Sequence, residues 1–181
     1  RLISGDFADL EVIVAGVFAG GTRPLNRSMQ HIRPWIESGG HFVSQYHRPI
    51  DNWDKTQSAP LRLQPGSPSI RWRVTDAAAP VQMLQPDHPL LNSPNGITGE
   101  DFDGWIKERG LYFASEWDPA YVPLLAMSDA DEAPLEGGLL AARIGAGSHV
   151  HCALNLFYQM DHMVVGAFRL FANLLTPSGR I

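Results

Sequence analysis

A strand-helix-strand pattern near the amino-terminal end constrains the fold of this chain most strongly. Residues 10–17 form an almost continuous aliphatic run, which is typical of a strand buried on both faces. Apolar side chains then recur at helical spacing between residues 25 and 36, and Gly39-Gly40 marks the end of that helix. A second apolar strand follows over residues 41–46. The pattern predicts a right-handed βαβ unit, and therefore a parallel pair of strands in an α/β domain.

The last quarter of the sequence predicts a β-hairpin followed by a buried helix. Apolar runs over 139–144 and 149–154 flank a glycine-rich turn. Beyond Tyr158 the apolar period becomes helical, and Arg169 is the only charge within residues 164–175. We expect this helix to be buried against the sheet or a partner subunit through a stripe of apolar side chains, widened by Leu170 and Leu174. The stripe consists of Val164, Phe168, Phe171 and Leu175.

Length and composition limit the class of protein. A chain of 181 residues is long enough for one domain, residues 1–181, with a full core. The net charge of −5 and the scattered basic residues argue against a nucleic-acid surface. No apolar run reaches the roughly 20 residues that a membrane helix needs. Cys152 is the single cysteine, which excludes an internal disulfide and favours a reducing, cytoplasmic location. A start at Arg1 instead of Met is compatible with a fragment of a longer chain.

Polar residues that follow the first two strands form the predicted ligand-binding site. Gln45, Tyr46 and His47 stand at the carboxyl end of the second strand, and Arg23 follows the first. Open parallel sheets bind ligands at this edge. The glycine-rich loop over residues 16–21 matches neither a dinucleotide fingerprint nor a P-loop, so a structural turn is favoured and no cofactor is predicted.

Two histidines of the predicted hairpin could ligate a metal. His149 and His151 are two residues apart on a strand, so their side chains share a face and could provide two ligands. A third ligand would come from Asp161 or His162, further along the chain. The favoured alternative is a hydrogen-bonded or solvated strand face without a metal.

Two further groups of residues could take part in catalysis. Cys152 lies within a strand rather than at a strand-to-helix elbow, which favours a buried, inert thiol over a nucleophile. The acidic residues Asp101, Asp103 and Glu108 surround Trp105, with Arg109 beside them. This pattern is more typical of a helix cap and a surface ion pair than of an acid–base pair.

Several stretches together resemble one known family. They are VIVAGVFAGGTR (12–23), GGHFVSQY (39–46), DHPLL (87–91), PNGITGEDFD (94–103), WIKERGLYFA (105–114) and GAFRLFANLL (166–175). These stretches, spread between about Leu10 and Leu175, resemble the class I glutamine amidotransferase-like domain attached to the C-terminal side of some bacterial PIG-L (LmbE-like) deacetylases. That group is related to ThuA-like domains. The resemblance implies a flavodoxin-like, mostly parallel sheet between helices that lacks its first strands. The sequence adds the C-terminal hairpin and buried helix.

Two departures from the family decide what function the resemblance implies. The cysteine elbow of true amidotransferases is replaced by Ser44-Gln45-Tyr46-His47, and the deacetylase zinc motif is absent. The resemblance therefore implies a non-catalytic accessory or ligand-binding domain that works with a deacetylase domain and takes a small-molecule or sugar ligand. One alternative is a stand-alone hydrolase that acts on a carbon-nitrogen bond or a sugar derivative through an unrecognised His/Asp site. Another is a purely structural assembly domain. A shortened sheet and an uncovered apolar helix also predict a homo-oligomer.

Overall fold

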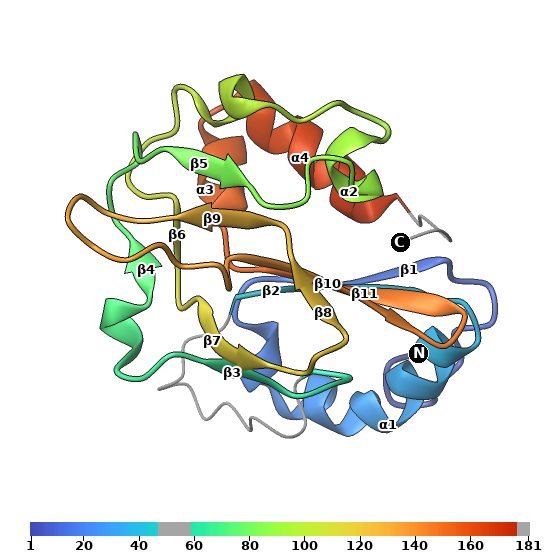
Figure 1. Cartoon of the computed structure of the whole chain (residues 1–181). Helices are drawn as coiled ribbons and strands as arrows, with labels where there is room; N and C mark the ends of the chain where they lie inside the picture. The colour runs from blue at the N-terminus through green and yellow to red at the C-terminus, as the bar shows by residue number, and fades with distance from the viewer. Residues whose placement is uncertain (47–58, 177–181) are drawn as a thin grey trace.

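A five-stranded sheet forms the centre of the molecule in the computed structural model, which describes residues 1–46 and 59–176 (Figure 1). The strands lie in the order β1-β2-β11-β10-β8. β1 pairs in parallel with β2, and β2 pairs in parallel with β11. β10 runs antiparallel to both of its neighbours, β11 and β8. The bounds are β1 Val12–Ala15, β2 His41–Gln45, β8 Tyr121–Pro123, β10 Leu139–Ile144 and β11 Gly147–Cys152.

The predicted flavodoxin-like, mostly parallel sheet is wrong, because half of the central sheet is antiparallel. The physical reason is the hairpin of β10 and β11. A short turn can join only antiparallel strands, and Gly145 makes this turn with a φ of +62°. Since β11 lies beside β2, its hairpin partner β10 must run the opposite way. β8 then extends the antiparallel half.

Residues 59–127 contribute three small antiparallel sheets besides β8. β3 pairs with β7, β4 with β6, and β5 with β9. The apolar run over 121–127 divides into β8 and β9, which belong to different sheets. The bounds are β3 Leu63–Pro65, β4 Arg73–Val74, β5 Val81–Met83, β6 Gly110–Leu111, β7 Ala114–Trp117 and β9 Leu125–Met127. Short 3-10 helices are η1 Ala19–Gly21, η2 Ser69–Arg71 and η3 Gly99–Phe102.

The βαβ unit is confirmed. Helix α1, Arg23–Glu37, connects the parallel strands β1 and β2. Its buried apolar stripe is the expected one, formed by Leu25, Met29, Ile32 and Ile36. Gly39 follows the helix with a φ of +123°, a conformation that favours glycine. Within residues 1–46 and 59–176, no helix is long and apolar enough to cross a membrane.

Two apolar layers cover the central sheet (Figure 1). α1 lies below the sheet in the view of Figure 1, and helices α2 Pro89–Asn92, α3 Leu156–Asp161 and α4 Val165–Leu175 lie above it. Successive residues of β2 face opposite layers: Phe42 packs with the α1 side chains, whereas Val43 packs with those of α3 and α4. Each strand residue therefore belongs to one defined side of the sheet.

The predicted buried face of α4 is correct at Leu170 and Leu174 but wrong at Phe168. Ala167, Leu170, Asn173 and Leu174 are buried, whereas Phe168 is 43% exposed and Phe171 is only partly buried. The helix is apolar around most of its circumference, so its hydrophobic period alone did not select the face that packs on the sheet.

Candidate functional site

The carboxyl ends of the parallel strands meet at one edge of the sheet. β1 ends at Ala15, β2 at Gln45 and β11 at Cys152, and the register aligns these ends. The segments that follow them contribute Phe18, Tyr46 and Phe157. In open α/β sheets, ligands bind beyond the carboxyl ends of the strands. This edge is therefore the first place to look for a binding site.

Tyr46 is the centre of an aromatic group at this edge. Its ring centroid lies 5.5 Å from that of Phe18, 5.9 Å from that of Tyr112 and 6.2 Å from that of Phe157. Tyr46 is only 3% exposed, whereas Phe18 and Phe157 are 39% and 41% exposed. The group, here called the edge aromatic group, thus has a buried centre and two exposed outer rings. Exposed aromatic rings on a buried support are suited to hold the apolar face of a ligand.

Two members of the edge aromatic group have a left-handed backbone. Phe18 has a φ of 65° and Tyr112 a φ of 62°. Such conformations cost a non-glycine residue about 1–3 kcal/mol and persist only where the surroundings hold them. The backbone N–H of Phe18 donates to the Tyr46 carbonyl at 3.1 Å, which fixes the loop after β1 against the end of β2. The rings are therefore preorganised by the fold.

Polar groups belong to the same segments as Tyr112 and Phe157. The Asn155 side-chain N–H donates to the Glu108 carboxylate at 3.0 Å, and the Asn155 backbone N–H donates to the Arg109 carbonyl at 2.9 Å. Asn155 is 1% exposed, and its Oδ1 atom has no hydrogen-bond partner among the described residues. A buried acceptor without a donor is uncommon in folded proteins and suggests a site that a ligand or water would complete.

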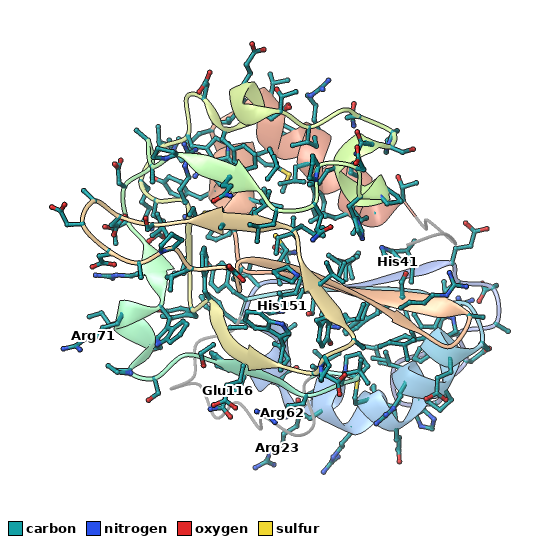
Figure 2. The ribbon with its side chains drawn as sticks, in the orientation of Figure 1. Arg23, His41, Arg62, Arg71, Glu116 and His151 are labelled. Atoms are coloured by element: carbon teal, nitrogen blue, oxygen red, sulfur yellow. The ribbon has the colours of Figure 1, made fainter. Side chains whose placement is uncertain are left out.

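The predicted ligand-binding residues do not all come together. Gln45 and Tyr46 are buried at the end of β2. Arg23 is exposed at the start of α1, on the other side of the sheet from the layer that includes Tyr46, and Figure 2 shows it pointing away from the molecule. His47 lies outside the described residues. Ligand binding at this edge stays a prediction, with Tyr46 as its structural centre.

His149 and His151 belong to a buried chain of hydrogen bonds. Tyr121 Oη lies 2.6 Å from His149 Nδ1, His149 Nε2 lies 2.9 Å from Ser44 Oγ, and the same oxygen lies 3.0 Å from His151 Nδ1. Both histidines are at most 1% exposed, and Figure 2 shows His151 in the interior. Burial raises the pKa of Tyr121 far above its ordinary value, so the phenol remains neutral. These contacts agree with the prediction that the two histidines form a hydrogen-bonded strand face.

The residues predicted as a third metal ligand do not lie beside these histidines. Asp161 and His162 are exposed at the end of α3. α3 packs on the Val43 side of the sheet, whereas His149 stacks on Phe42, which faces α1. In the described part of the chain, no group of three metal-ligating side chains comes together.

Cys152 and the carboxylates around Trp105 have structural contacts. Cys152 is 1% exposed, and burial raises the pKa of its thiol to about 12. Asp101 Oδ2 accepts from the Thr98 backbone N–H at 2.9 Å, as expected for a helix cap, and its Oδ1 accepts from Arg169 at 2.7 Å. Arg109 is buried rather than part of a surface ion pair, and its guanidinium donates to backbone carbonyls of Ala79 and Phe102.

Sequence reasoning missed Phe18, Tyr112, Asn155 and Phe157. Three of them follow strands that the sequence predicted, so a signal was available: Phe18 follows the first strand, and Asn155 and Phe157 follow the hairpin. Tyr112 gave no such signal, because its position beside Tyr46 results from the pairing of residues 110 and 154.

Comparisons with solved structures support the fold alone. Neither a protein-family model nor a curated protein matches the chain. A cytoplasmic protein from Salmonella typhimurium has a similar fold, with a TM-score of 0.62 and 12% identity over 91% of this chain and 70% of that one. Two glycosidases match less well. An exo-β-1,4-mannosidase from Opitutaceae bacterium strain TAV5 has a TM-score of 0.49 and 15% identity, over 95% of this chain and 26% of the enzyme. A β-galactosidase from Rahnella sp. R3 has a TM-score of 0.48 and 14% identity, over 92% of this chain and 23% of the enzyme.

Proposed function

We propose that this chain is a non-catalytic accessory domain that binds a small sugar-like ligand at the carboxyl edge of its parallel strands. The observation that carries the proposal is the edge aromatic group, in which buried Tyr46 supports the exposed rings of Phe18 and Phe157. A sugar ring presents an apolar C–H face to such rings and hydroxyl groups to nearby acceptors. Glu108 and Asn155 supply carboxylate and amide oxygens on the adjoining segments.

The described contacts of the candidate catalytic residues support a binding role. A nucleophilic cysteine needs an accessible thiol with a lowered pKa, whereas Cys152 is buried with a raised pKa. His149 shares hydrogen bonds with Tyr121 and Ser44 instead of facing a surface hollow. Cys152 and His149 are therefore part of the protein core, and the edge aromatic group is the better-supported site.

We further propose a partner domain for this chain. The sequence stretches that resemble amidotransferase-like domains support a PIG-L deacetylase as that partner, in the cytoplasm. The ligand would then be a substrate or product of the deacetylase. Self-association is a further part of the proposal. It is supported by β1, which forms one edge of the central sheet and leaves Val14 42% exposed.

Calorimetric titration tests the binding proposal. The probes are an N-acetylated aminosugar, its free amine and the plain hexose. We expect measurable binding of at least one probe, and Phe18→Ala or Phe157→Ala should weaken it by about two- to tenfold, because an aromatic contact contributes roughly 0.5–1.5 kcal/mol.

Phe168→Ala is the matched control, because it removes an equally exposed phenylalanine from α4. It should leave the affinity unchanged. Absence of binding to all three probes, or equal weakening by Phe168→Ala, would count against a sugar site at the edge aromatic group.

A further inference from the structure

A hollow lies on the opposite side of the sheet from Tyr46. It is bounded by the outer face of α1, by residues 59–62 and by Asp118, and its volume is about 770 Å³. This volume falls within the range of small-ligand sites, roughly 300–1,000 Å³. We call this cavity the basic hollow. Its polar lining comes from Asn26, Arg27, Gln30, Arg33, Arg62 and Asp118.

Arginine side chains make up much of the polar lining of the basic hollow. The chain has a net charge of −5, yet three arginines and a single carboxylate line this hollow among the described residues. Arg27, Gln30 and Arg33 recur at spacings of three residues, so they share one face of α1. Since Glu37 and Glu116 pair with Arg33 and Arg62, the positive charge that remains to attract an anion is that of Arg27.

The three arginines of the basic hollow differ in whether they already form an ion pair. Arg33 Nε lies 3.5 Å from Glu37, and Arg62 is paired with Glu116, as Figure 2 shows for the labelled side chains. Arg27 makes no ion pair with any described residue. Asp118 already accepts from the Ala120 backbone N–H at 2.9 Å. A guanidinium without a counter-ion is therefore available to a ligand.

Asn26 adds a hydrogen-bond acceptor to the hollow. Its Oδ1 atom is buried and has no hydrogen-bond partner among the described residues. A donor is needed to satisfy this oxygen, and a simple inorganic anion such as sulfate has none to offer. A hydroxyl group on the ligand would supply it.

We propose that the basic hollow binds a small hydroxylated anion, of the sugar phosphate or sugar acid class. Arg27, with Arg33 and Arg62, holds the anionic group, because guanidinium forks match phosphate and carboxylate oxygens. A ligand hydroxyl donates to Asn26 Oδ1. The site is separate from the edge aromatic group, since α1 covers the opposite face of the sheet.

Calorimetric titration with three probes tests the proposal: glucose 6-phosphate, glucuronate and inorganic sulfate. We expect at least one of the two sugar anions to bind, and the comparison between them identifies the anionic group. Arg27→Gln combined with Arg33→Gln should weaken that binding by about tenfold or more, as expected for loss of charge-assisted hydrogen bonds. Arg71→Gln is the control, because Arg71 is exposed, carries the same charge and does not line the hollow.

Asn26→Leu tests the hydroxyl contact separately. It should weaken binding of the sugar anion and leave binding of inorganic sulfate unchanged, while circular dichroism confirms that each variant is folded. The proposal is overturned if neither sugar anion binds, if the double arginine variant binds as tightly as the wild type, or if Arg71→Gln weakens binding equally. Equal loss of both ligands in Asn26→Leu would overturn the role of Asn26.

Discussion

His41 Nε2 donates a hydrogen bond to the Leu174 carbonyl at 2.7 Å, across 133 residues of sequence. The other ring nitrogen, Nδ1, lies 2.7 Å from Ser148 Oγ. Leu174 lies in the last turn of α4, where backbone carbonyls have no partner within the helix. His41 therefore satisfies a helix end that would otherwise be buried without a donor, and it joins β2 and β11 to α4.

The free energy of unfolding should fall in mild acid, because the His41 imidazole is buried. Burial lowers the pKa of His41 below its ordinary value of 6.5, and burial lowers the pKa of His88 in the same direction. Below about pH 6.5 the unfolded chain therefore binds protons that the folded chain does not, so the free energy of unfolding decreases as the pH falls toward the folded pKa values. Urea unfolding between about pH 7.5 and pH 5 measures this slope.

His41→Leu separates this contribution from the rest, because leucine neither donates a hydrogen bond nor titrates. The variant should be less stable at neutral pH, since the Leu174 carbonyl loses its donor, and its stability should depend less on pH. His162→Gln is the control, because His162 is exposed and leaves both contacts of His41 intact. A wild-type stability that stays constant or rises on acidification across this range would contradict the account of His41.

The buried face of α4 gives a second prediction. Leu170 is 1% exposed and Phe168 is 43% exposed on the same helix. Leu170→Ala should lower the free energy of unfolding by about 2–5 kcal/mol, because it leaves a cavity in the core. Phe168→Ala should lower it by about 1 kcal/mol or less, since little buried area is lost. Denaturant unfolding compares the two, and the reverse order of the two losses would show that α4 packs through the Phe168 face.

Asn173 gives a third prediction, because it is a buried polar residue on that same face. Its side-chain N–H groups donate to the Leu90 and Asn95 carbonyls at 3.0 and 2.7 Å, and its Oδ1 accepts from the Asn95 backbone N–H at 2.9 Å. Asn173→Ala should lower the free energy of unfolding by about 3 kcal/mol, since several buried backbone groups lose their partners. Thermal and denaturant unfolding measure the loss. A change within experimental error would mean that water replaces the amide.

The thiol of Cys152 should be unreactive in the folded protein. It is buried, and its raised pKa of about 12 keeps it protonated at neutral pH. A thiol reagent should therefore label Cys152 only after unfolding, and Cys152→Ala should change the free energy of unfolding by about 1 kcal/mol, because little volume is removed. Rapid labelling under native conditions would disprove the buried setting.

The sequence predicted the parts of the fold that depend on local pattern. The βαβ unit and the hairpin were predictable, because apolar period and glycine turns define them within a few tens of residues. The strand order was not, since β11 lies beside β2 only through contacts between distant segments. The face of α4 was predicted only in part, because Ala167 and Asn173 pack inward with Leu170 and Leu174, whereas Phe168 is exposed.

The candidate site was predictable only in part. The rule that ligands bind at the carboxyl ends of parallel strands led to Tyr46. Tyr112 reaches Tyr46 through the pairing of residues 110 and 154, and no sequence period indicates that contact. Arg23 was included because it follows the first strand, but as the first residue of α1 it faces solvent.

Chemical-shift mapping of the backbone amides with an uncharged N-acetylated aminosugar tests the central claim most directly. The account predicts that the perturbed amides include Phe18, Tyr46, Tyr112 and Phe157, with little change along the outer face of α1. No perturbation near these four residues, or perturbation confined to another surface, would contradict a sugar-binding site at the carboxyl edge of the parallel strands.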